Sequence, residues 1–221
     1  MLDRYQIIDI SQPVNSRTAC FPGDVPFKRE ITVSYQQSKV INLTALTMSP
    51  HVGTHADAPI HVFGDMDSGV DTIGFAPLDP YLGPCVVIDL AGRKEGIEVS
   101  HIRKKLERFK EFPKRVLFRT CQEIRYEVFE SEYAYFSPGL ISYLSSHGAV
   151  LAGIDTPSVD HVSSKTLPAH HELISSRMFW LENLDLTRAR EGSYFLIALP
   201  LKLMELEASP VRAVLLGKDY L

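Results

Sequence analysis

One short segment, SPHVGTHADAPIH at residues 49–61, concentrates groups that bind metal ions, since it holds three of the eight histidines of this 221-residue chain. Its candidate side chains are His51, His55, Asp57 and His61. Imidazole and carboxylate groups together form the ligand sets of catalytic zinc and related divalent ions, unlike the cysteines of closed structural sites. We therefore predict a metal site here. His61 need not be a ligand, because a neutral histidine beside a metal is also suited to proton transfer near pH 7.

The backbone of this segment must bend if the side chains are to share an ion. All four positions are odd-numbered, so one extended segment could present them on the same face. In a straight strand, however, His51 and His55 would lie roughly 13 Å apart, too far for ligands of one zinc. Gly53 is the position where the chain bends at little cost. A helix would also bring His51 and His55 together, but two prolines and this glycine oppose it.

A second group of candidate ligands lies downstream in LPAHHELISSRMFWLENLDL, residues 167–186. The candidates are His170, His171, Glu172 and Glu182. Pro168 predicts the first turn of a short helix that ends near Arg177, and residues 178–184 are typical of a strand. Periodicity does not choose among the four, and solvent-facing helix charges are an equal alternative. The other three histidines are interpreted as structural or exposed: His101, His147 and His161.

The elements that would position these groups alternate along the middle of the chain. Buried strands are predicted at residues 84–90, 115–120, 149–155, 192–203 and 209–217. One helix is predicted over residues 98–109 with Ser100 as its N-cap. Another is predicted between the N-cap Ser137 and Gly148, with Pro138 in its first turn. Because strands cluster towards the ends, we predict a single α/β domain, residues 1–221, with a mixed β-sheet core flanked by helices.

The bulk composition excludes several classes of protein. With 45% hydrophobic and 23% charged residues, the chain is typical of a globular protein. Its net charge of −4, with the signs interspersed, offers no surface for nucleic acid or an anionic membrane. The basic run at residues 103–110 is interpreted as the solvent face of an amphipathic helix. The chain has three cysteines and no CxxC pair, which indicates a reducing compartment. It shows no signal peptide and no membrane-spanning run, so we expect a cytoplasmic location.

The assembled motif resembles that of a known family. HVGTHADAPIH matches the signature HxGTHxDxPxH of the cyclase-like metal hydrolases, and further segments resemble the bacterial kynurenine formamidases within that family. These segments are DISQPV, FPGDVPF, LDPYLGPCVVID, GIDTPSVD, SKTLPAHH, LENLDL and LIALPLKL with ASPVRAVLL. The resemblance implies a cyclase-like fold of the swivelling β/β/α type. It also implies hydrolysis of N-formyl-L-kynurenine to L-kynurenine and formate in tryptophan degradation, carried out by a homodimer.

The resemblance also assigns roles to individual residues. The metal ligands would be His51, His55, Asp57, His170 and Glu182. Asp57 would bridge two zinc ions in each subunit, although Mn²⁺ or Fe²⁺ also suits such ligands. His61 matches the proton donor and acceptor of the family. Phe21 stands where formamidases usually have a tryptophan that lines the substrate pocket.

A few positions depart from the formamidase pattern. Phe21 keeps an aromatic face but lacks the indole N–H of tryptophan. Thr54 replaces an alanine, His161 replaces a proline, and residues 61–75 form a loop in which family members differ. None of these changes removes a ligand or His61. They therefore bear on substrate preference more than on the chemistry.

Three other functions are compatible with parts of the sequence. A related metal hydrolase of a cyclic amide, imide or lactone, such as isatin, would use the same ligands. A metal-free hydrolase would need an activated nucleophile, but the chain has no GxSxG motif, and Ser158 and Cys121 lack an activating context. A binding protein on the same fold would hold a structural metal or none. The complete ligand set and the later segments favour the formamidase.

Overall fold

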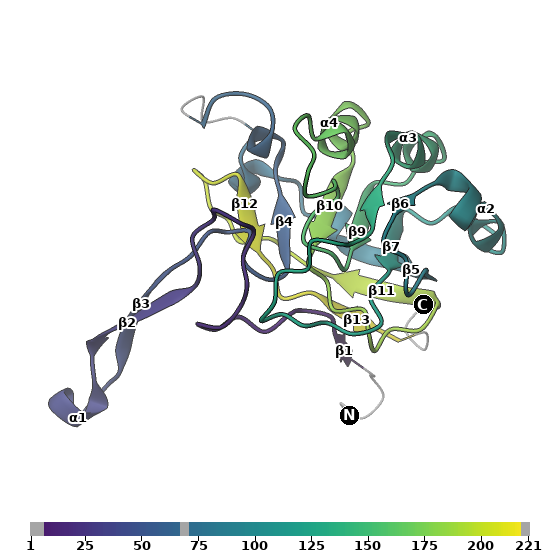
Figure 1. The fold of residues 1–221 in the computed structure, drawn as a ribbon. Coiled ribbons are helices and arrows are strands. Elements are labelled where there is room, and N and C mark those ends of the chain that lie inside the picture. The colour runs from purple at the N-terminus through teal and green to yellow at the C-terminus, as the bar shows by residue number, and fades with distance from the viewer. Residues whose placement is uncertain (1–6, 67–70, 218–221) are drawn as a thin grey trace.

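A mixed sheet of nine strands forms the centre of the computed structural model, which describes residues 7–66 and 71–217 (Figure 1). The strands are β1 Ile7–Asp9, β4 His55–Asp57, β5 Leu82–Asp89, β7 Arg115–Arg119, β9 Leu151–Ile154, β10 Phe179–Glu182, β11 Gly192–Ile197, β12 Ala208–Pro210 and β13 Val214–Leu216. Their order is β1-β13-β11-β5-β7-β9-β10-β4-β12. The central strands β5, β7, β9 and β10 are parallel to one another. The outer neighbours pair antiparallel, so the predicted mixed sheet is confirmed.

Three helices cover one face of this sheet: α2 Val99–Leu106, α3 Pro138–Ser146 and α4 Pro168–Ser175 (Figure 1). Their apolar side chains join alternate residues of the parallel strands, such as Ile88 and Phe118, in one core cluster. The intervening residues, such as Val87 and Leu117, belong to a second cluster on the other face. Because both faces are buried, the central strands are continuous apolar runs, which is why the sequence predicts them well.

The helices lie where the sequence predicts them, with one correction at a helix start. α3 follows its N-cap Ser137, whose hydroxyl accepts a hydrogen bond from the Leu140 backbone N–H. α2, in contrast, is capped by Glu98 and not by Ser100. The Glu98 carboxylate accepts from the His101 backbone N–H, and the His101 ring accepts from the Glu98 backbone N–H. This reciprocal pair satisfies two free donors at once, whereas Ser100 is already the second residue of the helix.

The two C-terminal strands differ from the prediction. The strand expected over residues 192–203 ends at Ile197, before Pro200, which has no N–H to donate to a neighbour. The strand expected over 209–217 is divided into β12 and β13. β12 pairs with β4 at one edge of the sheet, whereas β13 lies between β1 and β11. The pairing partners, and not the local pattern, decide where such short strands form.

A two-stranded arm projects from the body of the protein, and the sequence pattern does not predict it (Figure 1). It consists of β2 Lys28–Val33 and β3 Leu43–Thr47, with the short helix α1 Tyr35–Ser38 near its tip. Its exposed large apolar side chains are Ile31, Tyr35, Val40, Ile41, Leu43 and Leu46. An isolated hairpin is marginally stable in water, so such a surface is expected to contact another molecule.

The remaining elements are short. β6 Gly96–Ile97 and β8 Tyr135–Phe136 pair in parallel, and 3₁₀ turns occur at η1 Pro59–His61, η3 Ile73–Phe75 and η4 Asp79–Tyr81. The loop predicted over residues 61–75 thus begins at the end of η1 and ends in η3, and its residues 67–70 lie outside the described residues. In the part of the chain that is described, no helix is both long and apolar enough to span a bilayer.

Candidate metal centre

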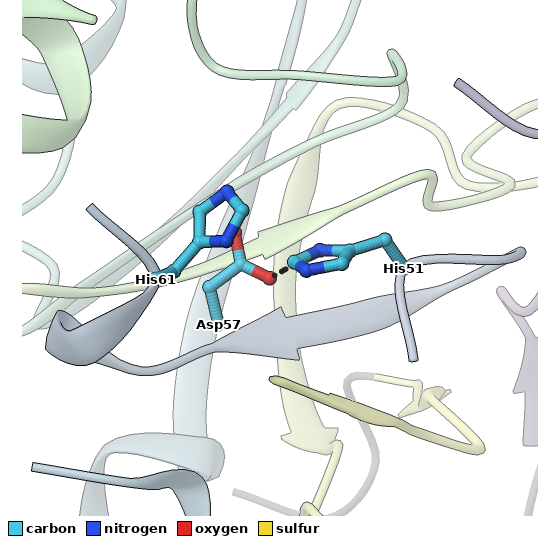
Figure 2. A group of neighbouring side chains, drawn as sticks. All are labelled: His51, Asp57 and His61. Carbon is cyan, nitrogen blue, oxygen red and sulfur yellow. Dashed lines mark ion pairs between the residues drawn. The ribbon is translucent and has the colours of Figure 1, made fainter. Parts of the chain in front are cut away.

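The histidine-rich segment brings its four side chains together, although only two of them lie in a strand. His55 and Asp57 belong to β4, whereas His51 precedes the strand and His61 ends the turn η1. His51 and His61 therefore lie outside the extended backbone, as the bend expected between His51 and His55 requires for His51. The bend lies at Gly53, as predicted, with φ +74 and a side chain only 2.6 Å from the place a Cβ would occupy. Figure 2 shows His51 and His61 on two sides of Asp57.

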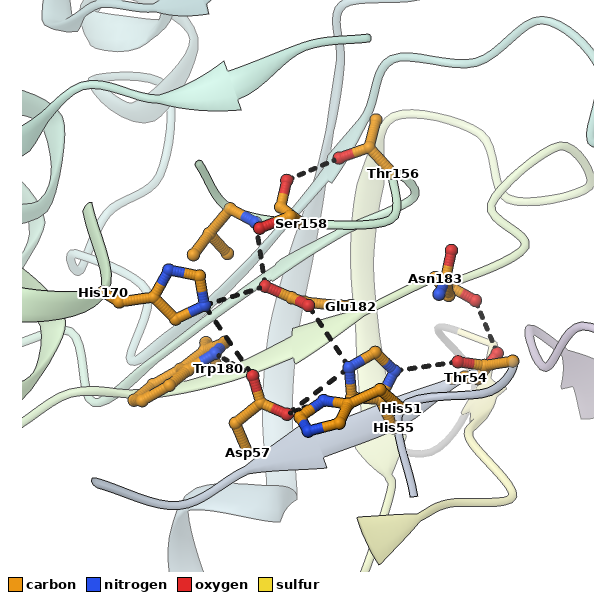
Figure 3. Close-up of polar contacts among 12 residues, drawn as sticks. His51, Thr54, His55, Asp57, Thr156, Ser158, His170, Trp180, Glu182 and Asn183 are labelled. Carbon is orange, nitrogen blue, oxygen red and sulfur yellow. Dashed lines mark hydrogen bonds and ion pairs between the residues drawn. The ribbon is translucent and has the colours of Figure 1, made fainter. Parts of the chain in front are cut away.

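Glu182 joins this group because of the register between two antiparallel strands. β10 pairs with β4 so that Glu182 lies opposite His55. Glu182 Oε2 is 3.2 Å from His55 Nε2, and the same nitrogen is 3.4 Å from Asp57 Oδ1 (Figure 3). The three side chains are at most 4% exposed. Their ligand atoms therefore meet in a volume from which bulk water is excluded.

Of the two adjacent histidines of α4, His170 faces the site and His171 faces the solvent. His170 Nε2 lies 3.5 Å from Glu182 Oε1 and 3.8 Å from Asp57 Oδ2. Glu172 points elsewhere and accepts hydrogen bonds from two serine hydroxyls. Among the four downstream candidates, the structure thus brings only His170 and Glu182 to the first cluster. These are the two that the family resemblance implies.

The combined cluster contains two groups of side chains that could each hold a metal ion and that share one carboxylate. These groups supply two sets of candidate ligand atoms, and within each set all atoms lie within 4.8 Å of one another. One set comes from His51, Asp57 and His61, and the other comes from His55, Asp57 and Glu182. Asp57 belongs to both sets. In the described part of the chain, His55 Nε2 and Asp57 Oδ1 are buried without a hydrogen-bond partner. Such orphaned atoms are costly, and a coordinated ion would satisfy both.

The charges in this site are strongly coupled. Burial lowers the pKa of His51, but the adjacent Asp57 carboxylate outweighs burial and raises this pKa to about 10. Burial raises the pKa of Asp57, yet the neighbouring charges of His51 and His55 hold it well below its usual range. At His61, burial dominates and lowers the pKa below the ordinary histidine value. The His61 imidazole is therefore neutral near pH 7 and able to accept a proton.

Two residues that the sequence pattern does not single out orient the candidate ligands. Trp180 Nε1 donates a hydrogen bond of 3.0 Å to Asp57 Oδ2 (Figure 3). Asp160 Oδ2 accepts from His170 Nδ1 at 2.7 Å and also accepts from the His170 backbone N–H. This contact fixes the His170 tautomer with Nε2 free to face the cluster. The one sequence signal for Asp160 is that it ends GIDTPSVD, a segment that resembles the formamidases.

Thr54, which stands in place of the usual alanine, anchors the bend to two other segments. Its hydroxyl accepts a hydrogen bond of 2.8 Å from the Gln12 backbone N–H and donates one of 2.5 Å to the Asn183 carbonyl. Asn183 directly follows the candidate ligand Glu182. The threonine thus ties β4 to the end of β10, and this departure from the family pattern has a structural role.

Replacement of Asp160 with asparagine is expected to weaken metal binding about 10- to 100-fold, because the His170 ring loses the carboxylate that fixes its tautomer and orientation. The emission of Trp180, the one tryptophan of the chain, gives the readout, since its indole contacts Asp57. The matched control is Glu172→Gln on the outward side of α4. Unchanged zinc affinity in Asp160→Asn would contradict this role.

A pocket opens beside the metal centre, and Phe21 lines it together with His51. The Phe21 side chain meets the ring of Phe129 edge-on, with the ring centroids 5.2 Å apart. Phe21 therefore stands where the family resemblance implies a substrate contact. His161 does not line this pocket, and its ring lies against Tyr135 with centroids 5.3 Å apart.

The two candidate nucleophiles are not activated. Burial raises the pKa of the Cys121 thiol to about 12, and the Asp155 carboxylate adds to the effect. The Ser158 hydroxyl is buried and accepts a hydrogen bond from the Asp160 backbone N–H. A nucleophilic hydroxyl or thiol needs a lowered pKa or an adjacent base. The geometry therefore offers no support for a metal-free hydrolase.

Several proteins of known sequence or structure are similar to this chain. Residues 8–161 match the family described as putative cyclase. The kynurenine formamidase of Paracidovorax citrulli is 43% identical over 208 residues, covering 94% of each chain. That of Bordetella pertussis is 42% identical over 207 residues, covering 94% of this chain and 96% of the relative.

Solved structures with the same fold include two kinds of hydrolase. A predicted metal-dependent hydrolase from Bacillus stearothermophilus has a TM-score of 0.79 and 26% identity, covering 97% of this chain and 99% of the other. Isatin hydrolase A from Labrenzia aggregata has a TM-score of 0.83 and 22% identity, covering 97% and 94%. The second likeness concerns the fold alone. The expected cyclase-like fold is confirmed.

Proposed function

Because the chain belongs to the cyclase family, with relatives 41% to 43% identical along nearly its whole length, we propose that it hydrolyses N-formyl-L-kynurenine to L-kynurenine and formate. One observation carries this proposal: two possible ligand sets share Asp57, one of them includes His61, and both lie next to a pocket lined by aromatic rings. The kynurenine formamidases among its relatives support the choice of substrate. The reaction would belong to tryptophan degradation by the kynurenine pathway.

We propose two zinc ions per subunit as cofactors. The residues that would hold them are His51, His55, Asp57, His170 and Glu182, with Asp57 bridging. A divalent ion in this position supplies Lewis-acid polarisation of a carbonyl and a water acidic enough to react near neutral pH. The ligand types do not exclude Mn²⁺ or Fe²⁺. The metal-dependent hydrolase among the structural relatives supports a metal in this site.

The reaction requires the transfer of a proton from water to the leaving nitrogen, and a side chain of the protein would carry it. The bond that breaks joins the formyl carbon to an arylamine nitrogen, which leaves readily only if it is protonated. We propose that His61 takes a proton from the attacking water and delivers it to that nitrogen. The burial of His55 and Asp57 excludes bulk water and strengthens every charge interaction at the reacting carbon. Phe21 would offer its face to the aryl ring.

Hydrolysis of N-formyl-L-kynurenine by the purified protein, measured before chelation, after it and with zinc restored, tests the proposal. Activity that disappears with the chelator and returns with zinc is the expected result. Isatin serves as the comparison substrate. Faster turnover of isatin would favour the related hydrolase, and no turnover of any amide by zinc-loaded protein would favour a binding protein.

We also propose a reducing, cytoplasmic setting for the protein. Cys20, Cys85 and Cys121 are all free thiols. Burial raises the pKa of the Cys85 thiol to about 12, as it does for Cys121. Thiols this basic contain little thiolate and react slowly with oxidants. Cys85 and Cys121 therefore behave as structural residues, as expected in a reducing compartment.

The projecting arm supports the further proposal of a homodimer. Its strands have no buried residue and carry the exposed apolar side chains described above. A second copy of the chain would cover this surface, and closed twofold assemblies are the most common homo-oligomers. The arm therefore gives the expected dimer a defined contact surface.

Replacement of Leu46 with aspartate is expected to convert the dimer into a monomer, because a charge would be buried in the apolar contact. Leu46 is 64% exposed in the single chain, so its replacement should leave the fold intact. Light scattering after gel filtration gives the mass. The control is Leu78→Asp, at a comparably exposed position (55%) outside the arm. A wild-type monomer would overturn the dimer, and a dimeric Leu46→Asp would exclude this contact.

A further inference from the structure

We propose that the pocket beside the metal centre contains a subsite for the zwitterionic α-amino acid end of the substrate, formed by Arg125 and Glu130. This inference rests on the proposed function, because N-formyl-L-kynurenine carries an ammonium and a carboxylate at the end away from its formyl group. Neither the proposed metal ligands nor His61 is placed to bind that ammonium or that carboxylate. A subsite that does so would select this substrate over simpler formanilides and over isatin, which has no amino acid end.

The Arg125–Glu130 ion pair and the metal centre border the same pocket. Its lining includes His51, the rings of Phe21 and Phe129, and both Arg125 and Glu130. The His51 side chain is only 15% exposed, whereas those of Arg125 and Glu130 are 58% and 39% exposed. The ion pair therefore lies on the solvent side of the pocket and the metal centre on the protein side. An aryl formamide with its formyl group inward would direct its charged tail towards the ion pair.

The charges of the two residues complement those of an amino acid. Apart from His51, Arg125 is the one basic side chain among the described residues that line the pocket. Guanidinium groups bind carboxylates through two parallel hydrogen bonds, and Glu130 would accept from the ammonium group. In the protein alone, Arg125 and Glu130 pair with each other. An exposed pair of this kind contributes little stability, so its opening for a ligand costs little.

The loop that carries both residues is held in place against the rest of the site. Its start is fixed because the Cys121 backbone N–H donates to the Asp155 carboxylate at 2.8 Å. The Ala19 backbone N–H donates to the Tyr126 carbonyl at 2.8 Å, which joins the loop to the segment that carries Phe21. Binding groups on a pre-positioned loop lose less freedom when a ligand binds. Arg125 and Glu130 are thus held beside the rings of Phe21 and Phe129 before substrate binds.

The decisive comparison uses N-formyl-L-kynurenine and formanilide, which has the same scissile bond but no amino acid end. In the zinc-loaded wild type, we expect kcat/KM to favour N-formyl-L-kynurenine. Arg125→Gln and Glu130→Gln should each reduce this preference roughly 10- to 100-fold, mainly through KM, as expected for the loss of a charged hydrogen bond. The double variant Arg125→Glu with Glu130→Arg keeps an ion pair in the loop but reverses its direction, and should stay impaired.

The matched control is Arg17→Gln, because Arg17 forms a comparable exposed ion pair, 3.0 Å from Glu127 of the same loop, but does not line the pocket. Its substrate preference should equal that of the wild type. Equal kcat/KM of the wild type for both substrates would overturn the subsite and leave the formamidase function intact. If Arg125→Gln loses kcat/KM equally on both substrates, or if the double variant regains the preference, then the ion pair only stabilises the loop and does not bind substrate. Failure on both substrates would overturn the proposed function and the subsite together.

A binding measurement gives a second readout that does not need turnover. L-kynurenine, titrated into the zinc-loaded protein and followed by calorimetry, should bind more tightly than 2-aminoacetophenone, which lacks the amino acid end. Arg125→Gln should remove most of this difference. Equal affinity of the wild type for the two compounds would overturn the subsite.

Discussion

Replacement of Asp57 with asparagine is expected to prevent binding of both metal ions and to lower hydrolysis of N-formyl-L-kynurenine by at least about a thousandfold. Among the described residues, Asp57 alone belongs to both ligand sets. Zinc takes Asp and Glu oxygens as ligands, and a neutral amide lacks the negative charge that holds two cations together. Loss of a single group that stabilises the developing charge costs about 10²- to 10³-fold, and here every metal contribution is lost.

Metal content by mass spectrometry, together with kcat/KM, checks this expectation. The fold should persist, because the asparagine oxygen can still accept the hydrogen bond that Trp180 Nε1 now donates to Asp57 Oδ2. Circular dichroism tests that point. The control is Asp89→Asn, since Asp89 lies at the end of β5 and pairs with Arg119 away from the cluster. Two zinc ions retained by Asp57→Asn would disprove the bridging role.

Replacement of His61 with alanine is expected to lower kcat about 10²- to 10⁴-fold while metal content stays unchanged, as for the loss of a general acid and base. The His61 ring lies 4.4 Å from that of His51 and 5.6 Å from that of His170, measured between centroids. It is therefore close enough to the ligands to exchange protons with a water among them. His147→Ala is the matched control, because His147 is exposed at the end of α3.

The same variant distinguishes two roles for His61, that of a proton carrier and that of a metal ligand. The structure also places it in a possible ligand set with His51 and Asp57. If His61→Ala loses one metal equivalent, then His61 is a ligand and the proton must move through another group. If the variant keeps both its metal and its activity, His61 has neither role. Only lost activity with full metal content agrees with the proposal.

The first cluster and most of the sheet could be predicted because the information is local. His55 and Asp57 are two residues apart, so any extended backbone places them on one face. The bend at Gly53 follows from a backbone conformation, φ +74, that glycine adopts without strain. The helix α3 is bounded by Ser137 and Gly148, whose side chain and backbone properties suit those positions.

The N-cap of α2 and the C-terminal strands were harder to predict because several local solutions compete. Ser100 and Glu98 both suit a helix start, and the reciprocal bond with His101 decides in favour of Glu98. Residues 209–217 are predicted as one strand, yet β12 and β13 pair with different strands. The arm lies outside the predicted elements although β2 contains the β-branched run Ile31, Thr32 and Val33, and its apolar side chains are exposed in the single chain.

The sequence alone was enough to predict a site of imidazole and carboxylate side chains around a bend, and it indicates the family to which that motif belongs. Which downstream residues meet the motif depends on how distant segments pack together. His170 and His171 are neighbours with the same side chain, and the packing of α4 on the sheet buries the first and exposes the second. Glu182 joins them because strand register places it opposite His55. Packing and register are set by contacts between distant segments, which a local pattern does not contain.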